Sequence, residues 1–365
     1  MDTLTQIVLG AGVGVAVLGR RLGPRRAAIA GGLLGTLPDL DVLIRFDDPV
    51  DAFVGHRGWS HSLLVQTALT PLLGEAMVRF IAALRWQRPL AYLAVFLCLT
   101  THALLDAMTI YGTKLLWPLS GEPYAVGSIF IIDALYTLPL LVAMIWALCL
   151  PQWSRRMGWV VTVALTLSTA YLGWSMAAQQ IVAQRAQAML GRAGIAAERL
   201  LAIPTPFNSY LWRVIALQDG RYLNLYLPVF AGSAKTSIYE HPRGLPLATC
   251  LGGNPSLDKL AWFSRGFYRL DQRPGQLGDE VVFSDLRMGL TPNYAFQFAI
   301  AQVQPGGARP IPARRLDGPR GTWADIEWLL ANLVHDPVVR LAENEAWLRM
   351  ADLSPATGIK SANAC

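Results

Sequence analysis

The stretch that organises this chain reads Gly55-His56-Arg57-Gly58-Trp59-Ser60-His61-Ser62 and forms a short polar break before a long apolar run. Two of the five histidines, His56 and His61, lie in it. Histidine is the commonest metal ligand, and its neutral ring nitrogen binds zinc without charge neutralisation. The stretch therefore raises the question of whether the rest of the chain brings further ligands to the same place.

Composition indicates a membrane protein with a water-exposed second half. Apolar residues make up 53% of the 365 residues and charged residues only 15%, against roughly 25% in an average protein. Long uncharged runs fill the first half, and charges are interspersed normally after about residue 181. We expect an α-helical polytopic membrane domain over residues 1–180, followed by a small extracytoplasmic α+β domain over residues 181–365.

The net charge of +6 does not indicate a nucleic-acid partner. Many basic residues lie at the ends of apolar runs, where they set membrane topology. The sequence contains no zinc-finger, helix-turn-helix or aromatic-plus-basic RNA-binding signature. The expected partner is the lipid bilayer, with no nucleic acid.

The apolar runs differ in length. Leu4 to Leu18 and Ala27 to Leu37 have 15 and 11 residues, short for a bilayer crossing of roughly 20 residues, so we expect buried or partial helices there. Four later runs are long enough to cross: Ser62 to Leu84, Pro89 to Met108, Ile129 to Leu150 and Trp159 to Ala178.

Arginines predict the orientation of these runs. Arg20 to Arg26, Arg85 with Arg88, and Arg155 with Arg156 lie at alternate ends of successive runs, so they can share one side. The positive-inside rule makes that side cytoplasmic. The opposite, outer face then receives Asp2, Asp39, Asp41, His56, His61, His102, Asp106 and Asp133.

Residues 181–365 alternate between helical and strand-like patterns. A helix over Ile181 to Arg199 is expected to precede a hairpin whose strands, Leu211 to Leu217 and Arg221 to Leu227, are joined by an Asp-Gly turn. Further strands are expected at 260–270, 281–288 and 294–303, then a loop at 305–321 and an amphipathic helix from Thr322. The last dozen residues are expected to be frayed, and His241 and His335, each close before a proline, to be loop histidines.

His102 and Asp106 carry the second half of the candidate site. Spaced four apart on a helix, they lie on one face and can hold one metal ion. Asp39 and Asp41 come from the end of a broken helix, and His56 and His61 from a loop. Imidazole and carboxylate ligands together suit zinc, manganese or iron better than calcium. The set could hold one ion, or two as in phosphoester hydrolases.

Four segments resemble the YdjM-like, LexA-regulated inner-membrane metal-dependent hydrolases. They are Met1-Asp2-Thr3-Leu4-Thr5, Leu37-Pro38-Asp39-Leu40-Asp41, His56-Arg57-Gly58-Trp59-Ser60-His61-Ser62 and Thr101-His102-Ala103-Leu104-Leu105-Asp106. The resemblance covers roughly residues 1–180. It implies a bacterial inner-membrane hydrolase that uses a divalent metal, but it supplies no substrate.

On that basis we assign expected roles. The metal ligands are His56, His61, His102 and Asp106, with zinc the favoured ion. Asp39 and Asp41 would bridge metal ions or orient a histidine, and Arg57 could hold a phosphate oxygen. A site at the bilayer surface favours an amphiphilic substrate, such as a phospholipid or a lipid-linked phosphate ester.

Other readings remain open at this point. His56 and His61 could cap the helix that starts at Ser62, and Asp39 with Asp41 could form an ordinary helix end. Asp133 could be a solvated residue at a helix end, and Glu75 with Arg79 a structural pair. At the level of function, the alternatives are a metal-binding transporter or a non-catalytic envelope scaffold.

Overall fold

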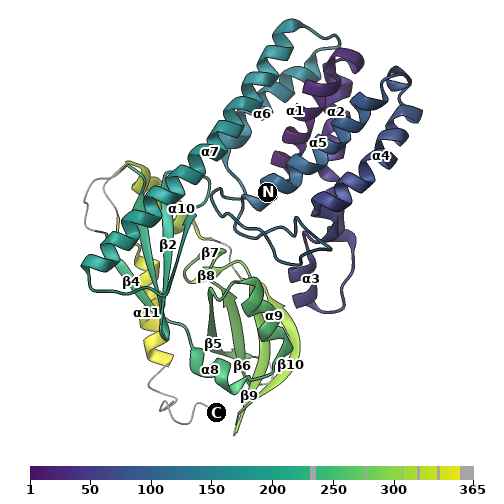
Figure 1. Cartoon of the computed structure of the whole chain (residues 1–365). Coiled ribbons are helices and arrows are strands. Elements are labelled where there is room, and N and C mark those ends of the chain that lie inside the picture. The colour runs from purple at the N-terminus through teal and green to yellow at the C-terminus, as the bar shows by residue number, and fades with distance from the viewer. Residues whose placement is uncertain (231–235, 276–277, 306, 319–320, 335–337, 354–365) are drawn as a thin grey trace. The chain divides into compact units, whose positions relative to one another are not determined.

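The protein, described by a computed structural model, folds into two compact units (Figure 1). The structure describes all residues except 231–235, 276–277, 306, 319–320, 335–337 and 354–365. The helical unit comprises residues 1–44, 56–178 and 206–209. The sheet unit comprises residues 45–55, 179–205 and the described residues from 210 onward.

The helical unit is built from six helices and three short 3-10 turns in the described residues. Helices α1, α5 and α7 are long and apolar enough to cross a membrane. Helix α6 is apolar but shorter. The bounds of the helices are α1 Thr3–Leu22, α2 Pro24–Thr36, α4 Leu63–Phe80, α5 Arg88–Ala107, α6 Ala134–Cys149 and α7 Arg155–Arg192, and those of the 3-10 turns are η1 Pro38–Leu43, η2 Trp59–His61 and η3 Ala82–Leu84.

Four helices differ from the expected runs. The run expected to cross at 62–84 is α4, which ends at Phe80, and the run expected at 129–150 is α6, which begins only at Ala134 and has 16 residues; neither is among the three helices of the described residues that are long and apolar enough to cross a membrane. Helix α1 has 20 residues and not 15, because it continues through Arg20 and Arg21 in its last turn. Basic side chains there complement the helix dipole. Helix α7 continues as one helix for 38 residues, so the expected last span and the expected helix after it are a single element. No proline interrupts the chain between Arg155 and Arg192.

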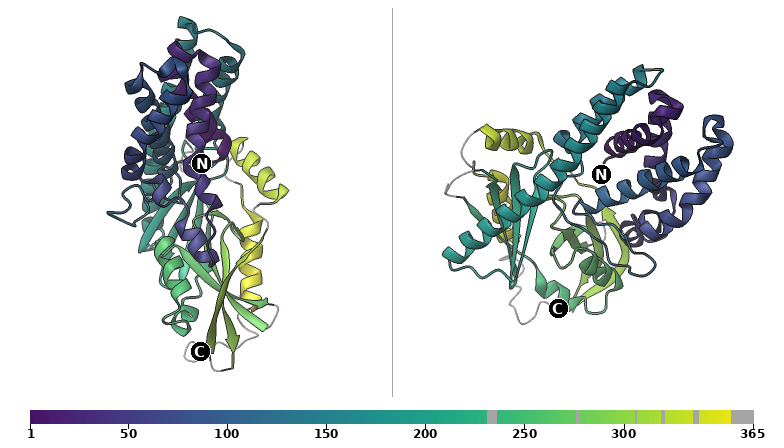
Figure 2. Two further views of the ribbon diagram at one scale, coloured as in Figure 1. Left: turned by 90° about the vertical axis from the view of Figure 1, so that its right-hand side faces the viewer. Right: turned by 45° about the horizontal axis from the view of Figure 1, so that its top comes forward.

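Glycines let α1 and α2 pack with their backbones in contact. A Cβ atom on Gly31 would lie 2.2 Å from the carbonyl oxygen of Gly10, and one on Gly14 would lie 2.5 Å from that of Ala27. Gly10 and Gly14 on α1, like Gly31 and Gly35 on α2, are four residues apart, the small-xxx-small spacing of close helix pairs in membranes. This pair forms the centre of the unit, with α5 and α6 packed against it. In both views of Figure 2 the purple helices α1 and α2 lie side by side.

The helical unit has two distinct ends (Figure 1). The arginine-bearing turns between α1 and α2, α4 and α5, and α6 and α7 lie at its upper end in that view, as the arginine positions predict. The side chain of Arg25 donates to the carbonyl of Leu148 at 2.6 Å and links two of these turns. The chain start and the C-terminal end of α5 lie at the other end.

The sheet unit contains two four-stranded antiparallel sheets and one two-stranded ribbon. The order is β1-β2-β3-β4 in the first sheet and β10-β9-β6-β5 in the second. The strands are β1 Arg199–Pro204, β2 Leu211–Gln218, β3 Arg221–Pro228, β4 Ile238–Pro242, β5 Tyr268–Gly275, β6 Gly278–Asp285, β7 Gly289–Leu290, β8 Asn293–Tyr294, β9 Gln297–Gln304 and β10 Gly307–Leu316. The helices of this unit are α3 Pro49–Gly55, α8 Leu245–Cys250, α9 Pro255–Phe263, α10 Trp323–Val334 and α11 Leu341–Leu353.

Each sheet has its own helical cover. Trp328 and Leu329 of α10 pack on Leu211 and Tyr226 of the first sheet. Phe263 of α9 and Phe53 of α3 meet over Phe298 of the second sheet. The helical unit followed by a sheet-rich unit matches the expected order of fold classes.

The predicted hairpin is confirmed, with Gln218 opposite Arg221 around the Asp219-Gly220 turn. The predicted strands at 281–288 and 294–303 correspond to β6 and β9, and the helix predicted from Thr322 is α10. The pair of Glu75 with Arg79 also forms, at 3.6 Å, although Arg88 lies closer to Glu75 at 3.1 Å.

Two predicted segments of this unit have a different structure, beginning with the strand expected at 260–270. Residues 255–263 form α9, because Asn254 caps the backbone N–H groups of Ser256 and Leu257 and a proline follows at the first helical position. Residues 307–316, expected as a loop, form β10. Prolines are tolerated there because β10 is an edge strand with a register shift between Pro310 and Arg314.

The expected helix also ends earlier than predicted, at Arg192, and β1 begins at Arg199. His335 and the last twelve residues, for which we expected a loop and a frayed end, lie outside the described residues.

His241 is not a loop histidine. It lies on β4, fully buried, and its Nε2 is 2.5 Å from Oε2 of Glu343. Tyr226 donates to the same carboxylate, and Arg340 forms an ion pair with it. Burial alone would raise the pKa of Glu343, but the hydrogen bond from His241 and the charges of Arg213 and Arg340 outweigh it and lower the pKa from 4.5 to about 2.

The glycine contact of α1 and α2 predicts an asymmetric mutational effect. Gly31→Ala should destabilise the helical unit by about 1–3 kcal/mol, because the new methyl group must push two backbones apart. Gly173→Ala on α7 is the matched control. Nothing lies within 4 Å of its added Cβ, so it should be neutral or slightly stabilising. Thermal unfolding of the purified protein in detergent measures both. Equal stability of the two variants would contradict the close packing.

The depressed pKa of Glu343 predicts acid sensitivity of the sheet unit. A carboxyl group whose folded pKa is lowered contributes stability above its unfolded value of 4.5, and this contribution is lost as the pH falls from 4.5 towards about 2. The loss should be on the order of 1–3 kcal/mol, at about 1.4 kcal/mol per pKa unit. Urea unfolding followed by tryptophan fluorescence at pH 7, 5, 4 and 3 tests this. The Glu343→Gln variant should be less stable at pH 7 and should lose this pH dependence; an unchanged pH profile would refute the assignment.

Candidate metal centre

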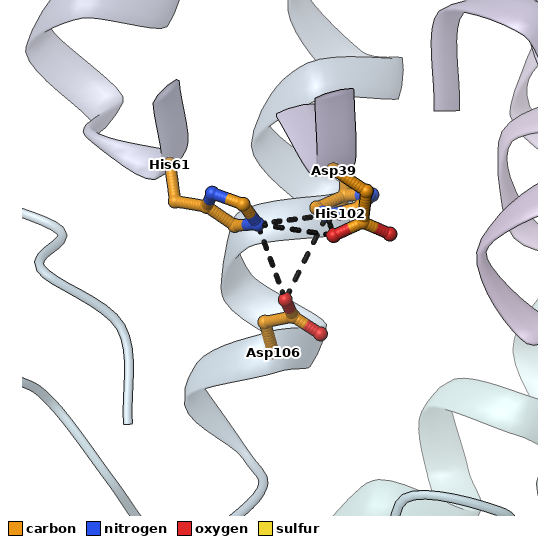
Figure 3. A group of neighbouring side chains, drawn as sticks. All are labelled: Asp39, His61, His102 and Asp106. Carbon is orange, nitrogen blue, oxygen red and sulfur yellow. Dashed lines mark hydrogen bonds and ion pairs between the residues drawn. The ribbon is translucent and has the colours of Figure 1, made fainter. Parts of the chain in front are cut away.

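Four side chains of the helical unit converge on one point: Asp39, His61, His102 and Asp106 (Figure 3). One ligand atom from each lies within 4.8 Å of all the others. The Nε2 atoms of His61 and His102 are 3.2 Å apart. From Nε2 of His61, Oδ1 of Asp39 is 3.4 Å away and Oδ2 of Asp106 3.3 Å. From Nε2 of His102, the same two oxygens are 3.4 and 3.7 Å away.

Three separate elements supply these groups. His102 and Asp106 are one turn apart near the C-terminal end of α5 and face the same way. Asp39 lies in η1, which begins at Pro38 directly after α2. His61 ends the turn η2 and precedes Ser62, whose hydroxyl caps α4. The polar stretch 55–62 is short because α4 begins directly after it, with Ser62 as its N-cap.

The tautomer of His102 follows from its partner. Its Nδ1 is 2.6 Å from the backbone carbonyl oxygen of Gly35. A carbonyl oxygen only accepts, so Nδ1 carries the proton and Nε2 presents its lone pair to the other three residues. Metal-ligating histidines commonly donate their second nitrogen to a carbonyl in this way.

His61 is oriented by a short relay. Its Nδ1 is 2.9 Å from the hydroxyl oxygen of Ser60, and that hydroxyl donates to Oδ2 of Asp41 at 3.1 Å. Because the Ser60 proton is given to Asp41, the hydroxyl oxygen accepts from Nδ1 of His61. This leaves Nε2 of His61 unprotonated and directed at the centre.

Asp106 uses its two oxygens differently. Oδ1 accepts a hydrogen bond from Nε2 of Gln6 at 2.9 Å and forms an ion pair with the amino group of Met1. Oδ2 lies 3.0 Å from Nε of Arg57 but accepts no hydrogen bond from any described residue. A fully buried carboxylate oxygen without a hydrogen bond is costly unless another cation completes it.

Electrostatics in the loops around the centre favour charged carboxylates. Burial alone would raise the pKa of Asp39, but His102 and His61 lie beside its carboxylate and, when charged, stabilise its ionised form; together they outweigh burial and hold the pKa well below its usual range. Burial alone would also raise the pKa of Asp41, but the interaction of its carboxylate with His56 outweighs burial and lowers the pKa. The pKa of His61 is raised despite its burial, because the carboxylates of Asp106 and Asp39 lie beside its ring and favour the charged form.

Access to the centre is one-sided. The side chains of His61, His102 and Asp106 are at most 1% exposed, whereas that of Asp39 is 28% exposed. Asp39 is therefore the member of the group that is open to solvent.

The donor set fits a divalent ion of the zinc type. Four ligands around zinc at 2.0–2.1 Å are separated from one another by about 3.3 Å in a tetrahedron, and the separations above run from 3.2 to 3.7 Å. The unbonded Oδ2 of Asp106 and both free Nε2 atoms face the same point. Imidazole with carboxylate suits zinc, manganese or iron.

The sequence-predicted residues divide into two groups. His61, His102 and Asp106 come together as expected, and Asp39 joins them. His56 does not: its Nδ1 is 3.0 Å from Oδ1 of Asp41, and its ring centre is 6.2 Å from that of His61.

Asp41 supports the stretch 56–61 without facing the centre. Besides Ser60 and His56, it accepts the backbone N–H of Arg57 at 2.9 Å. Arg57 itself has a left-handed backbone, with φ of 59°, which is strained for a residue with a side chain. Its guanidinium group is buried, bonded to Thr109 at 3.0 Å and placed over the ring of Tyr111.

Two acidic residues at this end of the unit are helix caps. Asp2 accepts the backbone N–H of Thr5 and caps α1. Asp133 caps α6, and one of its oxygens accepts from the hydroxyl of Tyr171 at 2.8 Å.

Three contributors were missed at the sequence level: Gln6, Gly35 and Ser60. The four-residue glycine spacing could have placed Gly35 at the helix contact. The roles of Gln6 and Ser60 depend on contacts between distant segments and carry no local pattern.

Residues 1–182 match the model of the YdjM inner membrane protein family, so the predicted resemblance is confirmed. The inner membrane protein YbcI of Escherichia coli (strain K12) is 37% identical over 113 residues, which cover 29% of this chain and 62% of YbcI. The chain thus matches less than two thirds of that relative's length. No solved structure matches.

Metal analysis of single variants tests the composition of the centre. His61→Ala and His102→Ala should each lose bound metal, because each removes one imidazole directed at the centre. His56→Ala should keep wild-type stoichiometry, since His56 contacts Asp41 instead. Elemental analysis after dialysis of the purified proteins gives the metal content per chain. Loss of metal in His56→Ala, with retention in His61→Ala, would contradict the arrangement.

Proposed function

We propose, for a chain whose residues 1–182 belong to the YdjM inner membrane protein family, that the centre holds one divalent metal ion and hydrolyses a phosphate ester at the membrane surface. The observation that carries the proposal is the convergence of two imidazoles and two carboxylates on one point that is open on the side of Asp39. A divalent ion bound there would supply Lewis-acid activation of a phosphoryl oxygen and of water.

The residues of the centre take different roles in this proposal. The three buried groups, His61, His102 and Asp106, hold the ion. Asp39 is the exposed member, and its carboxylate is kept ionised by its neighbours. We assign Asp39 as the general base because it is the exposed member of the group, which an attacking water can reach, and because its ionised carboxylate has a lone pair to take the proton. With Asp39 in this role and not as a ligand, the fourth position on the ion would be left for water or substrate.

Arg57 and Asp41 act through these groups. Nε of Arg57 lies 3.0 Å from Oδ2 of Asp106 and can fix the direction of that oxygen. Because its guanidinium is already engaged by Asp106 and Thr109, we assign Arg57 to positioning and charge balance in place of phosphate binding. Asp41 orients His61 through Ser60.

The substrate class is inferred from the surroundings of Asp39. Its neighbours Leu40, Val42 and Leu43 have exposed apolar side chains, at 52%, 73% and 73%. In a family of inner membrane proteins, such side chains are suited to contact acyl chains. This supports an amphiphilic substrate, a phospholipid or lipid-linked phosphate ester, whose headgroup reaches Asp39.

The membrane arrangement is part of the proposal. The arginine-bearing turns lie at the end of the helical unit away from the centre. With these turns on the cytoplasmic side, the helical unit crosses the inner membrane several times, the centre faces outward and the sheet unit is extracytoplasmic.

The Asp39→Asn variant separates catalysis from metal binding. It should retain metal, because the three buried ligands remain, and should lose hydrolysis by about 100-fold or more, the usual effect of removing a general base. Glu75→Gln on α4 is the matched acid-to-amide control and should retain activity. The assay measures phosphate or headgroup release from phospholipid in mixed micelles, with metal content determined on the same samples.

Three outcomes would count against this function. Wild-type protein with bound metal that releases nothing from any phospholipid or lipid-linked phosphate would refute the hydrolase. Metal flux into liposomes containing the protein would favour the transporter alternative. Full activity of Asp39→Asn would remove Asp39 from catalysis.

A further inference from the structure

The chain leaves the metal centre and returns to it through a loop whose middle belongs to the sheet unit. Asp39 and Asp41 precede this loop and His56 and His61 follow it, all in the helical unit. Residues 45–55 between them are part of the sheet unit. Ligands of the centre therefore stand on both sides of a segment that is packed in a different part of the fold.

Asp41 joins the two ends of the loop, residues 41 and 56–60, which we call the loop neck. Its Oδ1 lies 3.0 Å from Nδ1 of His56, and its Oδ2 accepts the backbone N–H of Arg57 at 2.9 Å. The same Oδ2 accepts the hydroxyl of Ser60 at 3.1 Å. One carboxylate before the loop thus holds three positions after it, 56, 57 and 60, the last of them directly before His61.

The middle of the loop is anchored by Phe53 of α3. This ring is buried, at 6% exposure, and lies in an aromatic cluster. Its centre is 4.8 Å from that of Phe263, 4.5 Å from that of Phe296 and 5.3 Å from that of Phe298. Burial of an aromatic ring among three others is among the stronger apolar contacts in proteins.

A second side chain of α3, Val50, is fully buried, and one ion pair adds to the contacts of α3 with the sheet unit. Asp51 forms an ion pair with Lys259 of α9 at 2.5 Å, a minor addition because both side chains are about half exposed. The anchor is therefore mainly apolar.

Helix α3 is directly adjacent in sequence to the residues that support the centre. Helix α3 ends at Gly55, and His56 follows directly. The next residue, Arg57, is held in a left-handed conformation with φ of 59°. Such strained backbone persists only where surrounding contacts over-determine it. Arg57 is the second residue after α3, and its own contacts include Asp41 and Asp106.

We propose that α3 is a tether through which the packing of the sheet unit sets the conformation of residues 56–61 and hence the metal affinity of the centre. Phe53 is then a positioning residue for His61, although it lies among the aromatic side chains of the sheet unit. The affinity readout of this proposal rests on the metal-binding function proposed above.

The test compares Phe53→Ala with wild type in the full-length protein in detergent. Metal affinity, measured by titration with zinc, should fall by about 10- to 100-fold, the range found when groups that support metal ligands are removed. In the metal-free proteins, hydrogen exchange of the backbone amides of residues 57–62 should become faster in the variant, because the loop neck opens more often.

Trp328→Ala is the matched control. Trp328 is a similarly buried aromatic residue of the sheet unit, but it packs on Tyr226 of the first sheet. It should leave zinc affinity and the exchange of residues 57–62 within about twofold of wild type. An equal effect of Trp328→Ala would overturn the tether, because general weakening of the sheet unit would then suffice.

The remaining outcomes are also decisive. If Phe53→Ala binds zinc like wild type and its residues 57–62 exchange at the wild-type rate, the tether is refuted. If wild type binds no zinc, the metal function fails, and hydrogen exchange still tests the tether. If Phe53→Ala does not fold, Phe53→Leu replaces it: faster exchange at residues 57–62 supports the tether, and wild-type exchange refutes it.

Discussion

The helical unit depends on the backbone contact between α1 and α2. Four glycines allow it, since a methyl group at Gly31 would overlap the carbonyl oxygen of Gly10. The contact has chemical consequences. It places Gln6 of α1 against Asp106 and the carbonyl of Gly35 against Nδ1 of His102. Two ligands on α5 are therefore oriented by the two helices that pack most closely.

A second constraint acts on the loops. Asp41 holds the backbone of Arg57 and, through Ser60, the ring of His61. Burying this many polar and charged groups is expensive unless each finds a partner. The pattern of partners leaves one face of Asp39, His61, His102 and Asp106 turned toward a common point. Buried groups at that point that receive no hydrogen bond from the described residues, Oδ2 of Asp106 above all, are what a bound cation would complete.

The candidate residues of this site could be predicted from the sequence, but not which of them face the centre. The i,i+4 spacing of His102 and Asp106 predicted their shared face, and the arginine pattern predicted which ends of the helices come together. His56 and His61 are equivalent in local pattern, however, and so are Asp39 and Asp41. The selection of His61 and Asp39 follows from tertiary hydrogen bonds to Asp41 that no spacing encodes.

The errors in the sheet unit have related causes. The prolines of β10 suggested a loop, but an edge strand with a register shift accommodates them. The proline after His241 suggested a loop histidine, whereas Glu343, more than 100 residues away, holds it in the interior. The hairpin of β2 and β3 was predicted correctly, because the Asp219-Gly220 turn by itself determines how the two strands pair.

X-ray absorption spectroscopy of the zinc-loaded, full-length protein tests the central claim most directly, because it counts imidazole ligands at the ion. The account predicts two imidazoles and oxygen ligands at about 2.0–2.1 Å, with the count falling to one imidazole in His102→Ala. A zinc ion with no imidazole ligand, or with a third one that disappears in His56→Ala, would contradict it.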